Sequence, residues 1–540
     1  MKDLFPGTCV APTGEFVYCI HKPHFTGFNL RETDYLINLG NTSDQEPINN
    51  ADNFPENNVD VTAGEWIFEI PNSFPFMGAT FILKSKADQT AGGNNPFNHH
   101  TLTGSLGEGQ DSDLETQSRG ALLALASTSD DPALLAKLAE KSCRFAYDNE
   151  SGAVSGMIYG KTDGGELRPL ILDNHLFQLV SNNQFLPDEY KQCMVLLPGA
   201  QGTNPIVGEY TQGDTHIWEY MRENSYIPWG HYAANMAHDA VRYRIQSLSG
   251  VDMVGLRHLY YQRIYVQLAA ELGVPQGVER RPMTVEELEV LRLSVLGEIE
   301  SRNKSGNDLP FNATLWGQNF GFDLSCSGYR LAASHQQIHQ QFALVSSRVL
   351  AYASGNNETS LCTMPAYTQT DLVMQFAGEY REKTGRGFFD TYLEALGNNQ
   401  RVDGRVDKES ALFFYQDENI IAFVPKAQRS QGEVQIMTKV RCGNILEADA
   451  EIRDSLDRAL LLTMKVLENL GVKMFVALEI PKRLDNPDTD QRLLYCFLPR
   501  HPQSPGGFSE FQQRWISNQY PEDFARACRD ELNSILEDET

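Results

Sequence analysis

The residue best suited to chemistry is His339, in a polar segment that also holds Ser334, Gln337 and Gln341. A neutral imidazole is a competent nucleophile near pH 7, because its unperturbed pKa is about 6.5. The hydroxyl and the amides around it can donate hydrogen bonds. A histidine between polar side chains is nevertheless more often a surface residue, so the segment alone leaves a structural interpretation open.

The spacing in this segment resembles the active-site signature of the histidine-triad superfamily, in its galactose-1-phosphate uridylyltransferase branch. That branch is written Ser-x-x-His-Pro-His-x-Gln, and the chain has Ser334-His-Gln-Gln-Ile-His339-Gln-Gln341. The serine, the second histidine and the last glutamine match. Gln337 stands where the family has its first histidine.

Likenesses at longer spacing accompany the signature. Residues 66–75 resemble the family's aromatic strand and Asn-Asp-Phe-Pro turn, with Asn72 at the asparagine and Ser73 at the aspartate. The segment that contains Asn319 resembles the family's Glu-Asn-Lys-Gly turn. Residues 238–249 match loosely, and residues 422–439 resemble a segment of its second domain. The chain is thereby identified as a divergent relative.

The resemblance implies a nucleotidyltransferase that moves a nucleoside monophosphate from a nucleotide sugar to a sugar 1-phosphate. His339 would carry the group covalently, which divides one displacement into two easier ones. Gln341 would donate its amide hydrogens to a non-bridging phosphate oxygen as charge builds there. A glutamine favours transfer over hydrolysis, because it cannot protonate a leaving group as a third histidine could.

The same resemblance assigns the remaining site residues. Ser334 would bind a β-phosphate oxygen, and Gln337 would lie in the substrate site. Asn319 and Asn72 would contact phosphate and ribose. The alternative for each serine or asparagine is a residue that only forms a turn.

Departures from the family pattern change the expected cofactors. Gln337 replaces a ligand of the family's structural zinc, and the N-terminal Cys-x-x-Cys pair that completes that site is missing, so we expect neither a metal nor another cofactor. In the second half, residues 494–499 occupy the place of the family's His-x-His and indicate a supporting wall. Lys426, Arg500 and His501 could meet an acceptor phosphate, although such residues are more often solvated charges.

Two other functions remain open at this stage. A phosphorylase of a dinucleoside polyphosphate or NDP-sugar would keep His339 and use inorganic phosphate as the acceptor. A catalytically inactive nucleotide-binding protein is suggested by Gln337 and Ser73. The resemblance also implies a homodimer.

Composition restricts the partners and the compartment. The chain has 540 residues, 41% of them hydrophobic, and a formal net charge of −26. This charge disfavours nucleic acids and anionic membranes, so local donors must hold any phosphate. Nine scattered cysteines without a Cys-x-x-Cys pair indicate reduced thiols. Since neither a signal peptide nor a membrane-spanning run is evident, we expect a cytoplasmic protein.

Hydrophobic periodicity predicts the elements that must hold His339. Strands are expected at 65–70, 81–83, 312–319, 412–415, 420–424, 433–437, 474–478 and 492–497, and helices at 131–138, 251–272 and 452–470, with a charged helical region at 275–308. Gly273 and Gly471 are expected to end helices.

The recurrence of strands and a long helix in both halves predicts an α+β fold. We expect two related histidine-triad-like units, with antiparallel sheets and helices packed on one face. A catalytic domain would span 1–395 and carry an insertion at about 92–230, which could be a substrate lid, an interface or a plain core. Residues 395–408 would link it to a degenerate unit at 409–540.

Overall fold

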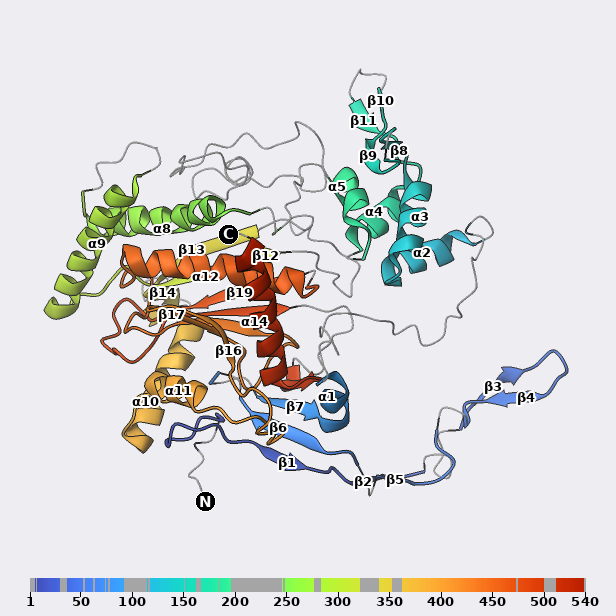
Figure 1. Cartoon of the computed structure of the whole chain (residues 1–540), viewed down its shortest axis with the longest axis horizontal. Helices are drawn as coiled ribbons and strands as arrows, with labels where there is room; N and C mark the ends of the chain where they lie inside the picture. The colour runs from blue at the N-terminus through green and yellow to red at the C-terminus, as the bar shows by residue number, and fades with distance from the viewer. Residues whose placement is uncertain are drawn as a thin grey trace.

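The computed structural model of the chain is drawn in Figure 1. The residues it describes are 5, 7–29, 36–51, 54–61, 64–72, 74–75, 78–91, 114, 117–149, 151–161, 167–183, 185–195, 245, 248–275, 283–320, 339–351, 362–472, 474–499 and 511–538.

A seven-stranded antiparallel sheet forms the centre of the molecule (Figure 1). In spatial order its strands are β13 (His339–Ser346), β12 (Phe311–Phe320), β19 (Phe475–Ile480), β20 (Leu494–Pro499), β18 (Val434–Thr438), β17 (Ile420–Phe423) and β16 (Phe413–Gln416). The fold is α+β, as predicted. Strands from both sides of the predicted linker join one sheet, and their origin in two related units stays a prediction.

One face of this sheet is covered by long helices. They are α8 (Gly250–Leu272), α12 (Ala450–Asn469) and α14 (Pro521–Asp538), and α9 (Val285–Ser305) packs against α8. Their apolar residues form a buried cluster with alternate strand residues such as Trp316 and Phe497. α8 begins at a capping box between Ser249 and Asp252 and ends at Gly273, whose φ is 75°.

The opposite face is also partly covered, so the expectation of helices on one face is wrong. α10 (Gln369–Thr384) and α11 (Phe388–Gly397) pack there with residues such as Phe423 and Leu494 in a second buried cluster. The reason lies in the strands. Every residue of β17 and β18 is buried, so both of their faces need a cover.

A smaller sheet joins segments from the two ends of the chain. Its order is β1 (Cys19–His21), β6 (Ile67–Pro71), β7 (Ala79–Leu83) and β21 (Arg514–Ser517), and α1 (Lys84–Thr90) follows β7. β21 runs parallel to β7, and the other pairs are antiparallel. This sheet carries the turn at Asn72.

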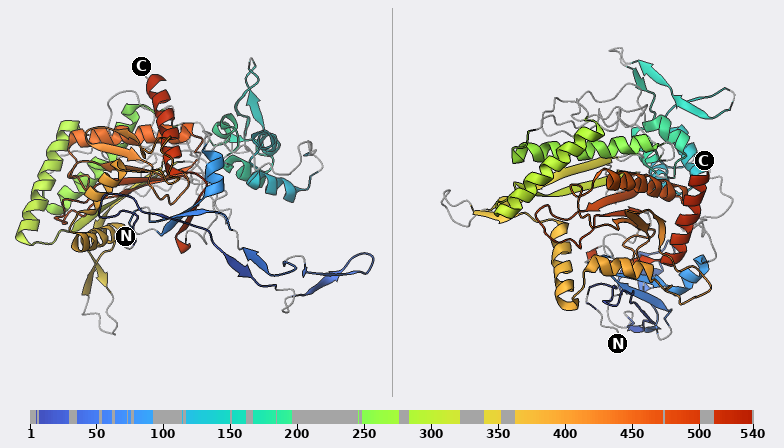
Figure 2. Two further views of the ribbon diagram at one scale, coloured as in Figure 1. Left: turned by 60° about the horizontal axis from the view of Figure 1, so that its bottom comes forward. Right: turned by 60° about the vertical axis from the view of Figure 1, so that its left-hand side comes forward.

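Directly after β1, the chain forms an arm that extends away from the body (Figures 1 and 2). The arm contains two antiparallel pairs, β2 (Phe25–Gly27) with β5 (Val59–Val61) and β3 (Asn38–Asn41) with β4 (Pro47–Asn49). Phe25 and Ile37 in this arm are 61% and 62% exposed.

Part of the predicted insertion folds around a core of its own. It contains α2 (Arg119–Thr128), α3 (Pro132–Ser142), β8 (Phe145–Tyr147), β9 (Val154–Met157), β10 (Tyr159–Lys161), β11 (Leu167–Pro169), α4 (Asn174–Asn182) and α5 (Asp188–Val195). Leu135, Leu138 and Val180 are fully buried in its apolar cluster. A further hairpin, β14 (Arg348–Ala351) with β15 (Cys362–Pro365), follows β13.

The predicted strands and the three predicted helices are present with ends shifted by a few residues, and the charged region at 275–308 contains α9. The predicted stripe of α8, including Met253, Leu256 and Tyr260, is buried. None of the described helices is long and apolar enough to cross a membrane.

Candidate active site

The candidate site lies where β12 pairs with β13. In the register of this antiparallel pair, Asn319 is opposite His339, and Gly317 is opposite Gln341. Asn319 is also paired with Val476 of β19. Two residues that the sequence assigned to one site are therefore direct cross-strand neighbours, a relation that sets Cα atoms about 4.5–5.5 Å apart.

Strand alternation separates the glutamines of β13. The side chain of Gln340 points toward α8, because its Oε1 accepts from Trp316 Nε1 at 2.8 Å and its Nε2 donates to the Leu256 carbonyl at 3.2 Å. Position 341 belongs to the other face of the sheet, together with position 339. Gln341 is exposed there.

Among the described residues of this second face, those beside Gln341 are exposed. Leu315 of β12 is 48% exposed and Ala343 of β13 is exposed. α10 and α11 contribute to the cluster that extends from β17 to β19, with residues such as Ile421, Met437 and Ile480. The described part of the chain therefore leaves the sheet beside Gln341 exposed.

Several predicted site residues lie outside the described residues or are described by their backbone alone. Ser334 and Gln337 lie outside the described residues, as do Arg500 and His501. His339 and Asn319 are described by their backbone. The predicted roles of these side chains stay predictions.

Asn72 lies in the turn after β6 and is 3% exposed, with φ 58°. Its amide donates to the carbonyl oxygens of Gly7 and Pro75, and its Oδ1 accepts from the Phe74 N–H at 3.0 Å. These contacts are those of a turn-forming asparagine. A contact to nucleotide stays a prediction.

A buried charge cluster supports the other side of the sheet. Arg257 of α8 is completely buried, and its Nη2 donates to the Tyr495 hydroxyl at 2.7 Å. Tyr495 in turn donates to Glu479 of β19, which also accepts from Tyr260 at 2.8 Å. Burial raises the pKa of Glu479, although Arg257 and the hydroxyl donors oppose this shift. The cluster ties α8 to β20 and to β19, the strand next to β12.

The matched segment of the second half forms internal contacts. Glu433 is fully buried and accepts from Arg429 Nε at 3.1 Å and from Gln435 Nε2 at 2.9 Å. Lys426 is 1% exposed, and its Nζ donates to Glu522 Oε1 at 2.6 Å and to Asn399 Oδ1 at 2.8 Å. Lys426 is therefore an internal ion-pair residue, in contrast to the solvated charge or acceptor ligand that the sequence suggested.

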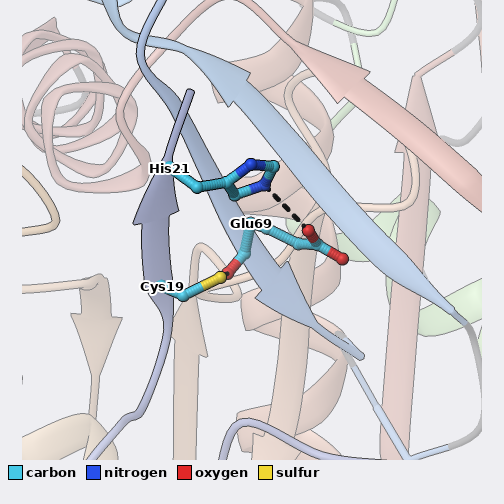
Figure 3. A group of neighbouring side chains, drawn as sticks. All are labelled: Cys19, His21 and Glu69. Atoms are coloured by element: carbon cyan, nitrogen blue, oxygen red, sulfur yellow. Dashed lines mark hydrogen bonds and ion pairs between the residues drawn. The ribbon is translucent and has the colours of Figure 1, made fainter. Parts of the chain in front are cut away.

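One group of side chains in the described part of the chain has the composition of a metal site. Cys19, His21 and Glu69 lie together on β1 and β6, and the atoms that could bind a metal are within 4.8 Å of one another (Figure 3). This group was not predicted from the sequence. Its signal is Cys-x-His, which places both side chains on one face of a strand.

Comparison with known proteins gives partial structural likenesses. No family model and no curated protein matches the chain. A solved uridylyltransferase mutant covers 47% of this chain and 72% of its own, with 16% identity and a TM-score of 0.32. An ADP-glucose phosphorylase from Arabidopsis thaliana with bound ADP-glucose covers 46% of this chain and 68% of its own, with 15% identity and a TM-score of 0.30.

A zinc-bound histidine triad family protein from Mycobacterium smegmatis is also similar in part. It covers 24% of this chain and 90% of its own, with 13% identity and a TM-score of 0.20.

Proposed function

We propose that the protein is a nucleotidyltransferase that moves a nucleoside monophosphate from a nucleotide sugar to a sugar 1-phosphate, with His339 as the covalent carrier. The observation that carries the proposal is the register of β12 and β13, in which His339 lies opposite Asn319 and Gln341 is exposed at the next position of the same face. Support comes from these residues rather than from the overall likeness to solved structures.

The proposed reaction has two displacements. A ring nitrogen of His339 attacks the α-phosphorus of the nucleotide sugar, forming a P–N bond as the bond to the bridging oxygen breaks. Sugar 1-phosphate leaves with that oxygen. A phosphate oxygen of the second sugar phosphate then attacks the same phosphorus and breaks the P–N bond, which regenerates the imidazole.

Gln341 would act on the charge that develops in both displacements. Its exposed amide is two residues from His339 on the same strand face, where it can donate to a non-bridging oxygen. A donor of this kind is typically worth about 2.7–4 kcal/mol when it is aimed at the developing charge. As an amide without a titratable proton, it stabilises the adduct without acting as an acid.

The intact mass of the protein tests the covalent step. Wild type is incubated with UDP-glucose or ADP-glucose without an acceptor, and we expect a mass increase of one nucleotidyl group, which is a nucleoside monophosphate less one water. The His339→Ala variant should gain nothing, and Gln340→Ala, altered on the opposite face, should still be labelled. An equal adduct on His339→Ala would refute the proposal.

The acceptor is identified by a chase of the labelled protein. Loss of the adduct with a hexose 1-phosphate, but not with inorganic phosphate, supports the transferase. Release as a nucleoside diphosphate with inorganic phosphate indicates the phosphorylase instead. A rise in melting temperature with nucleotide, without any adduct or turnover, indicates a nucleotide-binding protein without catalysis.

A further inference from the structure

Three side chains of metal-binding type converge at the edge of the smaller sheet, on the two strands β1 and β6 (Figure 3). His21 Nε2 lies 3.0 Å from Glu69 Oε2, and Cys19 Sγ lies 3.7 Å from the backbone oxygen of Glu69. The three ligand atoms are within 4.8 Å of one another. This group lies in a different sheet from the strand that contains His339.

The strand geometry explains the convergence. Cys19 and His21 are alternate residues of β1 and so share one face. Glu69 is the direct cross-strand partner of Cys19 in the antiparallel register, which puts its side chain on that same face. The backbone therefore sets the three donors together.

We propose that Cys19, His21 and Glu69 bind a divalent transition metal ion of the zinc class. A thiolate, an imidazole and a carboxylate are the three donor types that zinc takes in proteins. Around a tetrahedral zinc, with donors about 2.0–2.3 Å from the ion, neighbouring donors are about 3.3–3.8 Å apart. The observed spacing reaches this with small side-chain rotations.

The surroundings fit a metal site that is open to solvent. The side chains of His21 and Glu69 are 42% and 31% exposed, and Cys19 is exposed, so an ion can enter without unfolding. Glu69 Oε2 faces His21, while its Oε1 lies 3.7 Å from Arg514 Nη1. Arg514 can therefore hold the free oxygen of a carboxylate that binds the metal through Oε2. With three protein ligands, the fourth position belongs to water.

Binding exchanges a proton for the metal. The thiol of Cys19 loses its proton to solvent, and the contact between His21 and Glu69 is replaced by two bonds to the ion. The ion then cross-links β1 and β6, next to the point where the arm begins with β2. These residues differ from the ligands of the family's structural zinc, which the chain lacks because Gln337 replaces a histidine and the Cys-x-x-Cys pair is missing. A metal at this site would depart from the prediction of a metal-free protein.

Cobalt(II) tests the site because its bonds to thiolate absorb light, whereas zinc is silent. The full-length protein is treated with a chelator, dialysed and titrated with Co²⁺. We expect a thiolate-to-cobalt charge-transfer band that saturates at one ion per chain and disappears when Zn²⁺ is added. Absence of the band in the folded wild type would overturn the proposal.

Matched variants assign the ligands. Cys19→Ser should abolish the charge-transfer band. His21→Gln or Glu69→Gln should lower the affinity for Zn²⁺ at least about 100-fold, since losing an outer-shell partner already lowers metal affinity by about 10- to 100-fold. Cys193→Ser and His24→Asn alter a thiol and an imidazole outside the group and should bind as wild type. If Cys19→Ser keeps the band, or if Cys193→Ser loses it, the assignment is wrong.

A stability measurement separates ligand loss from misfolding. Zn²⁺ should raise the melting temperature of wild type and of the two control variants, because it binds the folded state. The same addition should leave Cys19→Ser unchanged, while its chelated form melts near the chelated wild type. An equal rise in Cys19→Ser would contradict the site.

Discussion

Asp457 of α12 accepts a hydrogen bond from Arg257 of α8, at 3.1 Å between Oδ1 and Nε, with the two side chains only 8% and 0% exposed. The Tyr261 hydroxyl donates to the same oxygen at 2.9 Å. Four aromatic rings surround the Arg257 guanidinium, with centroids 4.8–5.2 Å from Cζ. Two of the long helices on one face of the central sheet, α8 and α12, are thus tied together by a buried charge pair.

Breaking this pair should be strongly destabilising. Arg257→Met leaves the Asp457 carboxylate buried without its cation, and we expect the free energy of unfolding to fall by about 3–5 kcal/mol. Urea unfolding followed by circular dichroism measures the loss. Arg405→Met, which removes a surface pair with Asp407, should cost less than about 1 kcal/mol. Equal losses in the two variants would contradict the assignment.

His258 on the same helix predicts how stability depends on pH. Burial lowers its pKa from 6.5 to about 4, the hydrogen bond with Gln262 opposes this, and Arg453 adds to it. Between these values the unfolded chain takes up a proton that the folded chain refuses, so stability falls as pH falls from 6.5 to 4. The difference amounts to about 3 kcal/mol in total.

Comparison with a variant isolates this contribution from that of the carboxylates. The free energy of unfolding is measured at pH 7.0 and 4.5 for wild type and His258→Asn. We expect the drop between the two pH values to be about 2 kcal/mol smaller in the variant. Parallel pH profiles would show that His258 titrates normally in the folded protein.

Local patterns predicted the elements but not how they combine. The apolar stripe of α8 and the strands around 420–437 could be predicted because hydrophobic periodicity depends only on residues that are close in sequence. The joining of β12 and β13 to β19 in one sheet could not be predicted in this way, because strand pairing depends on contacts between distant parts of the chain. The cover on the second face, by α10 and α11, was missed for the same reason.

The candidate site was also predicted only in part, because some of its residues are brought together by contacts between distant parts of the chain. The motif spacing placed His339 and Asn319 in one site, and the register makes them neighbours. Lys426 was misjudged because its partner, Glu522, is remote in sequence. Cys19 and Glu69 could not be associated before the pairing of β1 and β6 was known.

Lys426 yields a prediction that separates the acceptor role from the internal one. In Lys426→Met the buried Glu522 loses its cation, and its Oε2 already has no hydrogen-bond partner among the described residues. We expect a loss of about 3–5 kcal/mol in stability. The KM for the acceptor, measured at a temperature where the variant is folded, should stay within twofold.

Two outcomes would change that assignment. The exposed control Lys304→Met should cost less than about 1 kcal/mol. A large rise in acceptor KM in Lys426→Met, with stability unchanged, would return the residue to the substrate site.

Asn72 can be tested through its left-handed backbone. Asn72→Ala keeps φ 58° only with strain and loses three hydrogen bonds, so we expect a loss of about 2–3 kcal/mol. Asn72→Gly loses the same bonds without the strain and should be about 1 kcal/mol more stable than the alanine variant. Thermal melts give the order. A glycine variant that is stable but has a raised KM for nucleotide sugar would support the predicted nucleotide contact.

The adjacent glutamines of β13 offer a matched test of the site itself. Gln341→Ala removes an exposed amide from the open face and should lower kcat about 10²- to 10³-fold, because a donor to the developing charge is lost. Its stability should change by less than about 0.5 kcal/mol. Gln340→Ala removes the contacts to Trp316 and Leu256 and should lower stability by about 1–3 kcal/mol. Its kcat should stay within a few-fold of wild type, because its side chain lies on the helix side of the sheet. If the two variants exchange these effects, the face assigned to the chemistry is wrong.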